Sequence, residues 1–410
     1  MNPSYRIVFY VSGHGFGHTS RTIEVIHAVL RARPEAQIVV KTSAPPRLFA
    51  RTLRLRSPLE FARGDPELVE ASGQAHERGC ELVELQCDAG MVQIDSLKVD
   101  TAESIRRAVG FQKGLPELIA SEAAYLGNSG TRVVVGDIPP LAFAAAHAAG
   151  IPSVALGNFT WDWIYDDYRD EAAAGLARDL RRLYAKATVA LRLPMAGGFE
   201  GMEPVTRDIP FVARHSSRMQ DDVRRALGVP PRAEGKPLVL MSFGGYGVAG
   251  LDTAALAQLK DYTIATTDSP AFAASPLRRG RPAAHNAIRP AAGVLHISEQ
   301  QVYDNGLRYE DLVRGADVVV TKPGYGIISE AIANDAALLY TSRGHFVEYD
   351  LLVKEMPRYL RARFIEQDDL LRGNWTDALE KLLQQPAPPE TPALNGAEIA
   401  AAEILRQGQD

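Results

Sequence analysis

Short apolar runs alternate along this chain with stretches in which apolar residues recur every three or four positions. The first run, at residues 7–11, is typical of a buried strand. In the stretch after it, Ile23, Ile26 and Leu30 fall on one side of a helix. A second apolar run follows at residues 37–41. This order of strand, helix and strand predicts the βαβ opening of a parallel, doubly wound sheet.

The alternation continues and restarts once. Further strands are predicted at 132–137, 151–156, 238–243, 262–266, 293–296, 318–320 and 337–340. A loop-like stretch at 193–210, a helical stretch around 217–227 and a proline-containing linker at 228–237 separate the two series. We therefore predict an N-terminal domain at 1–215, a C-terminal domain at 236–385, and a spacer with a final helix at 386–410.

Glycine-rich turns follow three of the predicted strands, at residues 13–18, 244–247 and 323–326. Glycines let backbone N–H groups approach a ligand closely, and the N-terminus of the next helix favours negative charge, so such turns can hold a phosphate. The first turn is not a dinucleotide fingerprint, because His18 occupies the place of the third glycine. The turns predict an α/β protein with two Rossmann-like domains facing a central cleft.

The composition and net charge limit the kinds of binding partner that the sequence supports. A net charge of −5 gives no support for binding to nucleic acid or to an anionic membrane. Cys80 and Cys87 lack the partners of a zinc site, so we expect reduced thiols in a cytoplasmic protein. The apolar run near the N-terminus is short, and no later stretch is long enough to span a bilayer. We predict neither a signal peptide nor a membrane span.

Candidate acid–base residues gather at the first turn. His18 closes this turn, and an unperturbed histidine pKa near ~6.5 suits a general base. His14 is the competing candidate. Asp137 ends a predicted strand and could orient the histidine. Alternatively, His18 bonds locally, and Asp137 caps the helix that starts near Pro139.

A second group of polar residues surrounds the turn at Gly324. Glu330 offers only acceptors, which suits the paired hydroxyls of a ribose, although a first-turn acid also complements the helix dipole. Lys322 is a candidate cation for a phosphate. The polar turn at 343–350 is either a sugar-binding loop or a solvated charged one.

Several motifs, taken in order, give the sequence a family likeness. They are GHGFGH at 13–18, GDIPP at 136–140, NFTWDWIY at 158–165, RLP at 192–194, DIP at 208–210 and KPGYG at 322–326. The sequence resembles the GT-B glycosyltransferases over most of residues 5–360, and above all the glycosyltransferase-like N-terminal domain of plant L-arabinokinases. A weaker likeness exists to lipid-II-forming and UDP-glucuronosyl transferases, which have a histidine after an N-terminal glycine turn.

The resemblance implies an acceptor in the first domain and a nucleotide-sugar in the second. It implies catalytic roles for His18, His14 and Asp137, and acceptor contacts by Phe16, Asn158, Trp161 and Trp163. The implied donor-binding residues are Gly15, Gly17, Ser242, Gly244, Gly245, Lys322, Gly324, Tyr325, Gly326, Ser329, Glu330, His345, Glu348 and Asp350.

Two departures from family patterns bear on the mechanism. Retaining GT-B enzymes usually carry two glutamates that flank a turn like that at Gly324; here Glu330 is present, but Lys322 occupies the other place. This favours an inverting mechanism. The chain has no Asp-x-Asp triplet, which favours a metal-free site. The leaving phosphate would then be stabilised by backbone N–H groups, a helix terminus and a cation.

We predict an inverting, metal-independent glycosyltransferase that transfers a sugar from a nucleotide-sugar, with UDP as the expected nucleotide, to a small-molecule hydroxyl. No cofactor is expected. Two alternatives remain at this point. One is a sugar-nucleotide 2-epimerase-like enzyme, and the other is a non-catalytic module that binds a nucleotide-sugar.

Overall fold

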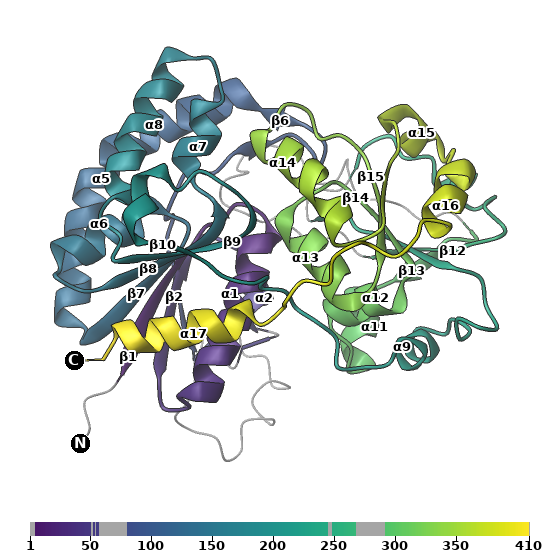
Figure 1. The fold of residues 1–410 in the computed structure, drawn as a ribbon, viewed down its shortest axis with the longest axis horizontal. Coiled ribbons are helices and arrows are strands. Elements are labelled where there is room, and N and C mark those ends of the chain that lie inside the picture. The colour runs from purple at the N-terminus through teal and green to yellow at the C-terminus, as the bar shows by residue number, and fades with distance from the viewer. Residues whose placement is uncertain are drawn as a thin grey trace. The chain divides into compact units, whose positions relative to one another are not determined.

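The computed structural model describes residues 5–50, 52–53, 55–56, 80–244, 248–267 and 292–409 (Figure 1). The chain divides into two compact units. Unit 1 comprises Met1–Met91, Thr101–Val212 and Leu394–Asp410, and unit 2 comprises Val92–Asp100 and Ala213–Ala393. The predicted domain boundary at 215 lies close to the end of unit 1 at Val212. The two divisions differ at residues 92–100, which belong to unit 2, and at 394–410, which belong to unit 1.

Unit 1 is built on a parallel sheet with β1 in its interior. Within the described ranges the strand order is β10-β9-β8-β7-β1-β2-β4-β3. At the end of β1, Val11 pairs with Thr42 on one side and with Asp137 on the other. The strands are β1 (Arg6–Val11), β2 (Gln37–Thr42), β3 (Leu55–Arg56), β4 (Cys80–Glu84), β7 (Thr131–Asp137), β8 (Ser153–Phe159), β9 (Val189–Gly197) and β10 (Thr206–Asp208).

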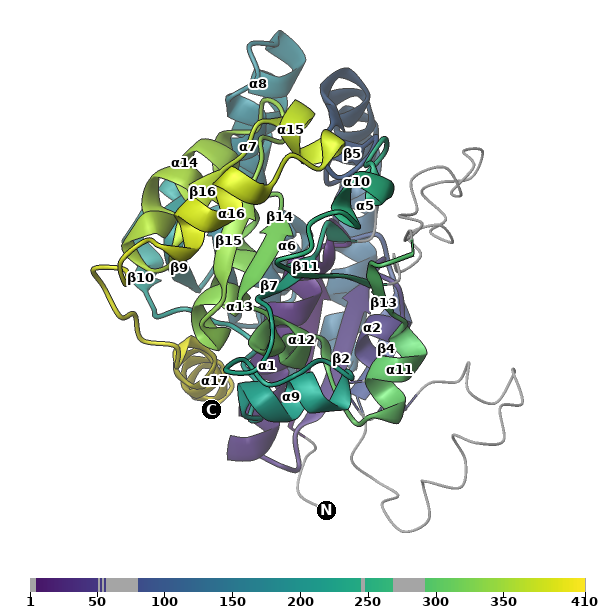
Figure 2. The ribbon, with the colours of Figure 1, turned by 90° about the vertical axis from the view of Figure 1, so that its right-hand side faces the viewer.

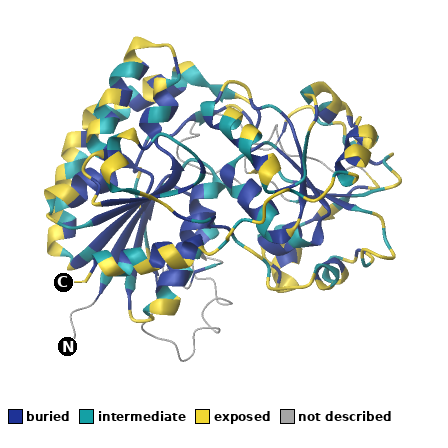
Figure 3. Ribbon diagram, in the orientation of Figure 1, coloured by how far each residue is buried: buried dark blue, intermediate teal, exposed yellow. Residues whose placement is uncertain are grey.

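Helices cover this sheet, and their polar sides remain exposed while the central strands are buried (Figure 3). In α8, for example, Asp170 caps the N-terminus by accepting from the N–H of Ala173, and Leu176, Leu180 and Tyr184 form a buried stripe. The helices are α1 (Phe16–Ala32), α2 (Arg47–Ala50), α5 (Thr101–Asn128), α6 (Pro140–Ala148), α7 (Trp161–Asp166), α8 (Glu171–Tyr184), the 3-10 helix η1 (Glu200–Val205) and α17 (Gly396–Gln407).

The C-terminal helix α17 completes unit 1. It packs against α1, β7 and β8 (Figure 1). The hydroxyl of Tyr5 donates to the carbonyl of Leu405 at 2.9 Å. Gly396 lies against the backbone of Pro210 and Phe211, where a Cβ would approach the Pro210 carbonyl oxygen to 2.2 Å. The start of this helix therefore requires glycine.

Unit 2 repeats the doubly wound pattern. Its described parallel strands have the order β13-β12-β11-β14-β15-β16. They are β11 (Leu238–Met241), β12 (Thr263–Thr267), β13 (Leu295–Ile297), β14 (Val318–Thr321), β15 (Ala337–Tyr340) and β16 (Ala362–Phe364). The helices are α9 (Gln220–Ala226), α10 (Thr253–Leu256), α11 (Glu299–Asp304), α12 (Tyr309–Gly315), α13 (Tyr325–Asn334), α14 (Val347–Glu355), the 3-10 helix η6 (Met356–Arg358), α15 (Gln367–Arg372) and α16 (Thr376–Leu383). Helix α12 packs against α9, α13 and β11 (Figure 2).

A hairpin that we call the arm, residues 92–100, also belongs to unit 2. Its strands β5 (Val92–Gln93) and β6 (Val99–Asp100) pair in antiparallel fashion, and the N–H of Ile94 bonds the carbonyl of Lys98 at 2.9 Å. Leu97 is 4 % exposed and lies in the apolar core of unit 2 with Met241 and Phe243. This core contact explains why a short hairpin from between two elements of unit 1 belongs to unit 2.

The predicted α/β class and the two doubly wound domains are confirmed, and two local predictions are wrong. Residues 193–210 are not a loop: β9, η1 and β10 occupy much of this stretch. The pairing of β9 with β8 passes Pro194, with residues 189–192 paired ahead of it and Gly197 paired after it. The turn predicted at 13–18 is shorter than expected: helix α1 begins at Phe16, because Gly15, with φ +78°, completes the turn earlier. His18 therefore lies in the first turn of the helix.

Candidate functional site

The strand order of unit 1 indicates where a ligand would bind. From β1 the chain proceeds outward to β2, and it later returns to the other side of β1 as β7. In doubly wound sheets, ligands bind at the carboxyl ends of the strands at such a switch point. Asp137 is the last residue of β7, and His18 lies in the helix that follows β1. The topology therefore brings both residues to the expected edge of the sheet.

His18 and Asp137 are in direct contact and buried. Nδ1 of His18 lies 2.8 Å from Oδ1 of Asp137, and the two residues are 5 % and 0 % exposed. Arg21 donates to both carboxylate oxygens, at 2.7 Å through Nε and at 2.5 Å through Nη2, and Thr22 donates to Oδ2 at 2.9 Å. Burial alone would raise the pKa of the Asp137 carboxyl, but Arg21 and then His18 outweigh it and lower this pKa to about 2. Asp137 is therefore a fixed negative charge.

The contacts of His18 define which ring nitrogen carries the proton. A carboxylate oxygen at 2.8 Å requires a donor on the ring, because two acceptors at that distance would repel one another. Nη2 of Arg21 also lies 2.9 Å from Nδ1, a contact that by itself would suit an acceptor there, but Arg21 already donates to Oδ1 of Asp137 and the carboxylate can only accept. We therefore assign the neutral ring the Nδ1–H tautomer. Nε2 is then the nitrogen that can accept a proton.

His14 has the opposite tautomer. Its Nδ1 accepts the backbone N–H of Met91 at 3.2 Å, so a neutral ring carries its proton on Nε2. Its ring also packs edge-on against Trp161, with centroids 5.3 Å apart. A histidine held in this way offers a hydrogen-bond donor rather than a basic nitrogen. The geometry thus favours His18 over His14 as the base.

Asp88 is a second buried carboxylate in this part of unit 1, and the sequence analysis did not single it out. It accepts the indole N–H of Trp161 at 2.9 Å and a hydrogen bond from Ser12. Burial raises the pKa of its carboxyl, and Ser12, His18 and Trp161 offset that rise only in part. Its position in a loop after β4 carries no motif, so only the fold shows that it lies near His18.

The four predicted acceptor residues differ in exposure. Asn158 and Trp161 are each 1 % exposed and have internal partners: Asn158 accepts from Nη1 of Arg21 at 2.7 Å, and Trp161 donates to Asp88. Phe16 and Trp163 are partly exposed. Trp163 lies against Gly197, where a Cβ would approach its ring to 2.3 Å. Contact with an acceptor stays a prediction, and Phe16 and Trp163 are the better placed pair.

Unit 2 has an equivalent switch point between β11 and β14. The N–H of Ser242, just after β11, bonds the carbonyl of Val320 at 2.9 Å, and the hydroxyl of Thr321 bonds the carbonyl of Ser242 at 2.6 Å. Lys322 follows β14 directly. Helix α13 then starts with neither a side-chain cap nor an acidic residue in its first turn, and a Cβ at Gly324 would meet no atom within 4 Å. This edge of unit 2 therefore offers N–H groups and open space to an anion.

Lys322 is surrounded by charged and polar side chains of its own unit. Its Nζ lies 3.5 Å from Oε1 of Gln93 in the arm. Burial, and then the positive charge of Arg343, lower the pKa of the Lys322 ammonium well below its usual range, while Glu348 and Asp95 act in the opposite direction. A lysine in such surroundings gains from a bound anion, which would restore a favourable environment for its charge.

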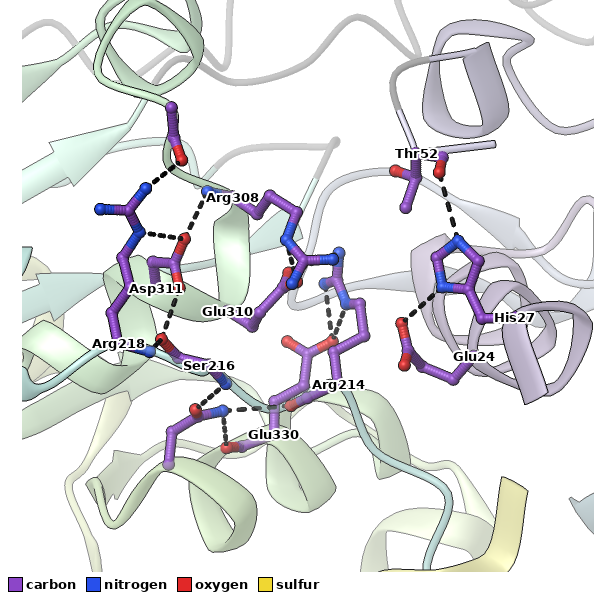
Figure 4. Close-up of polar contacts among 12 residues, drawn as sticks. Glu24, His27, Thr52, Arg214, Ser216, Arg218, Arg308, Glu310, Asp311 and Glu330 are labelled. Atoms are coloured by element: carbon purple, nitrogen blue, oxygen red, sulfur yellow. Dashed lines mark hydrogen bonds and ion pairs between the residues drawn. The ribbon is translucent and has the colours of Figure 1, made fainter. Parts of the chain in front are cut away.

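Glu330 has a strong internal partner that the sequence did not reveal. It is 4 % exposed, and its Oε1 accepts from Arg214, with Nε at 2.8 Å and Nη2 at 2.6 Å (Figure 4). Arg214 also lies 3.6 Å from Glu310, which in turn accepts the guanidinium of Arg308 at 2.9 Å. A ribose hydroxyl would therefore share the Glu330 carboxylate with Arg214.

The other residues predicted to bind the nucleotide-sugar differ in their exposure to solvent. His345 and Asp350 are exposed, Glu348 is buried 3.7 Å from Arg343, and Ser329 donates to the carbonyl of Gly326 at 2.9 Å. Gly244 is exposed with φ +67°, and Tyr325 is buried. Gly15 and Gly17 belong to unit 1 beside His18, and Gly245 lies outside the described residues. These donor contacts stay predictions.

Two further observations concern only the part of the chain that the structure describes. No three His, Cys, Asp or Glu residues there are grouped so as to hold a metal ion. None of its helices combines the length and the apolar composition that a membrane span requires.

Comparison with known proteins finds similarity both in sequence and in structure. The chain is 28 % identical over 407 residues to L-arabinokinase from Arabidopsis thaliana, a match that covers 97 % of this chain and 34 % of the plant protein. The chain thus spans about a third of the length of that relative. No model of a known protein family matches the chain.

Solved glycosyltransferases share the fold of the whole chain. The glycosyltransferase of kitacinnamycin superposes with a TM-score of 0.59 at 16 % identity, covering 98 % of both chains. A UDP-glucosyltransferase from Polygonum tinctorium that glucosylates indoxyl gives a TM-score of 0.53 at 13 % identity, covering 100 % of this chain and 94 % of that one. At these identities the comparison shows the fold, which is GT-B.

Proposed function

We propose that this protein is an inverting glycosyltransferase that transfers a sugar from a nucleotide-sugar to the hydroxyl of a small-molecule acceptor. The observation that carries the proposal is the His18–Asp137 contact at the switch point of unit 1, in a chain with the GT-B fold. A histidine with Nδ1–H bonded to a carboxylate that is ionised near neutral pH has its other nitrogen available as a base. A module that only binds a nucleotide-sugar would not need this arrangement.

In the proposed reaction His18 acts on the acceptor. Its Nε2 removes the proton of the acceptor hydroxyl while that oxygen forms a bond to the anomeric carbon of the donor sugar. The bond from the anomeric carbon to the phosphate oxygen breaks, and the nucleoside diphosphate leaves with the electron pair. Asp137 stabilises the imidazolium that forms, because its negative charge is adjacent to Nδ1–H. Attack on the side opposite the leaving group inverts the anomeric configuration.

The donor is assigned to the switch point of unit 2. The N-terminus of α13 and Lys322 would stabilise the charge that develops on the leaving diphosphate. Lys322 stands where a retaining enzyme would carry a glutamate, which supports inversion. UDP is the nucleotide that we expect. A cytoplasmic location also stays a prediction; Cys80 and Cys87 are both buried as free thiols.

The proposal is tested by incubating the full chain with single nucleotide-sugars, alone and with a panel of hydroxyl-bearing acceptors. Mass spectrometry should detect a glycosylated acceptor and a free nucleoside diphosphate, and proton NMR of the fresh product should show the inverted anomer. A new isomer formed from the nucleotide-sugar alone would instead identify an epimerase. Tight nucleotide binding without any product across the panel would identify a binding module.

Glu330→Gln should weaken nucleotide binding by ~1–3 kcal/mol, the cost of a lost hydrogen bond to a charged group. Calorimetric titration of the folded variant with UDP measures this effect. Glu310→Gln is the matched control, because it also removes a carboxylate beside Arg214. If the two variants lose affinity equally, Glu330 acts through Arg214 and does not contact the ribose.

Activity should survive a chelator, because backbone N–H groups, a helix terminus and Lys322 stabilise a diphosphate without a divalent ion. We expect the same initial rate in EDTA-treated protein as in protein supplied with Mg²⁺ or Mn²⁺. A rate that vanishes in EDTA and returns only with added metal would contradict this mechanism.

A further inference from the structure

Arg21 reaches from helix α1 to two neighbouring strands, and it is buried. Its guanidinium donates to the Asp137 carboxylate at the end of β7 through Nε and Nη2, and to Oδ1 of Asn158 in β8 through Nη1 at 2.7 Å. The exposed fractions are 4 % for Arg21, 0 % for Asp137 and 1 % for Asn158. All three side chains therefore lie inside unit 1, where their bonds to one another satisfy polar groups that have little access to water.

The carboxylate of Asp137 is held in one orientation. Its oxygens accept from Arg21 as a fork, with Nε on Oδ2 and Nη2 on Oδ1, and Thr22 donates to Oδ2 as well. Two bonds from one guanidinium fix the plane of a carboxylate, which a single donor does not. Oδ1 is the oxygen that lies against Nδ1 of His18. The plane of the carboxylate thus determines the direction of its bond to the imidazole.

The imidazole of His18 is held at two places. Nδ1 lies against Asp137, and the ring packs edge-on against Phe159, with centroids 5.5 Å apart and an angle of 82° between the planes. His18 and Arg21 are three residues apart on α1, so both project from one face of the helix. Arg21 is consequently close enough to bond the imidazole itself, because Nη2 lies 2.5 Å from Oδ1 of Asp137 and 2.9 Å from Nδ1 of His18.

A rotation of the Arg21 guanidinium would change the state of the histidine. If Nη2 moved from the carboxylate to Nδ1, that nitrogen would have to accept, and the proton of the neutral ring would lie on Nε2. The basic nitrogen would then be bonded to Arg21 and would no longer be available to a hydroxyl. Asn158 opposes this rotation, because its carbonyl oxygen holds the other terminal nitrogen of the guanidinium, Nη1.

We propose that Arg21 and Asn158 are positioning residues that act on His18 through Asp137 and keep the proton of the neutral imidazole on Nδ1. This role rests on the proposed function, because a general base needs Nε2 without a proton, and it extends that function to two residues outside the histidine–carboxylate pair. It also replaces the acceptor contact that the sequence predicted for Asn158. A purely structural ion pair would depend on the charge of Arg21 and far less on its fork.

The tautomer of His18 can be observed without donor or acceptor. Long-range ¹H–¹⁵N NMR spectra of protein labelled with ¹⁵N-histidine distinguish the two neutral tautomers, and His18→Ala identifies the signal. At a pH where the ring is neutral, we expect the proton on Nδ1 in the wild type and partly on Nε2 in Asn158→Ala. Asn158→Asp should restore the wild-type tautomer, because it still offers an oxygen to Nη1 of Arg21.

Turnover provides the second measurement. Arg21→Lys keeps the charge but loses the fork, so it should fold, shift the tautomer and lower turnover by up to about 10²-fold, as for a reacting group displaced by about 1 Å. The KM for the acceptor should stay unchanged. Arg192→Lys is the matched control, because Arg192 makes a comparable fork with Asp208 where both side chains are exposed. This control should alter neither the tautomer nor the turnover.

Three results would overturn the positioning role. A proton on Nε2 in the wild type contradicts the arrangement directly. An unchanged tautomer in both Arg21→Lys and Asn158→Ala leaves these residues a structural role only, and the proposed function stands if product still forms. A higher acceptor KM in Asn158→Ala, with unchanged turnover, returns Asn158 to the acceptor. A wild-type chain that forms no product from any nucleotide-sugar removes the proposed function itself, and the positioning role with it.

Discussion

His18→Ala is expected to lower turnover by roughly 10²–10⁴-fold, the usual contribution of a positioned general base. Its affinity for the nucleotide should stay within about 1 kcal/mol of the wild type, because His18 acts on the acceptor and belongs to unit 1, whereas Lys322 and Glu330 belong to unit 2. Single-turnover rates with a saturating nucleotide-sugar, together with calorimetric titration, separate these two effects. A variant that keeps normal turnover would exclude His18 as the base.

His14→Ala is the control for this experiment. Nδ1 of His14 accepts a backbone N–H, so the loss of its ring should reduce turnover far less than the loss of His18 does. If His14→Ala abolishes turnover while His18→Ala does not, the base is His14. If neither histidine matters, the model of acceptor activation is wrong, and Asp137 becomes the candidate to examine.

Asp137→Asn is expected to destabilise the protein by about 3–5 kcal/mol near neutral pH, because it leaves Arg21 buried beside a partner without charge. Urea denaturation followed by tryptophan fluorescence measures this loss. Asp208→Asn is a matched control, since Asp208 pairs with Arg192 at the exposed strand β10. It should cost less than about 1 kcal/mol. Equal costs for the two variants would show that the Arg21–Asp137 pair is no stronger than a surface pair.

The pH dependence of the same variant follows from the pKa of Asp137. In the folded protein this pKa is lowered from 3.8 to about 2. The carboxylate therefore contributes its full stabilisation above about pH 4, and this contribution is lost as the pH falls toward 2, where the unfolded chain has already bound the proton. The gap in free energy of unfolding between the wild type and Asp137→Asn should thus narrow by about 2 kcal/mol on acidification. A gap independent of pH would contradict the lowered pKa.

The architecture could be predicted because each element carries its own local signal. The strand β15 was predicted at 337–340 and occupies Ala337–Tyr340, and β1 and β14 follow equally plain apolar runs. The prediction failed at β9, where Pro194 and nearby glycines are typical of a loop. Residues 189–192 ahead of that proline and Gly197 after it nevertheless pair with β8, and such pairing depends on distant parts of the chain.

The candidate site could be predicted only in part, for a related reason. His18 closes a glycine-rich turn and Asp137 ends a predicted strand, so the sequence predicted that both lie at one edge of the sheet. Nothing in the local sequence distinguishes Arg21 from other helix residues. Its pairing with Asp137 depends on how β1 and β7 align in the sheet, which the sequence does not show. Likewise, the pairing of Glu330 with Arg214 joins residues 116 positions apart, and neither has a motif that names its partner.

The passage of the chain back and forth between its units determines how the protein can be divided experimentally. A protein cut at residue 212 would separate each unit from a piece of its own interior: unit 2 would lose Leu97 from its core, and unit 1 would lose α17 from the surface of α1. Separate expression of the two halves should therefore give insoluble material. A stable version of unit 2 alone would need the arm joined to it through a new peptide linker, and one of unit 1 would need α17 attached after Val212. In genetic terms, the coding segments of the two folds are interleaved in one reading frame, so neither fold could be moved to another protein as a single uninterrupted segment.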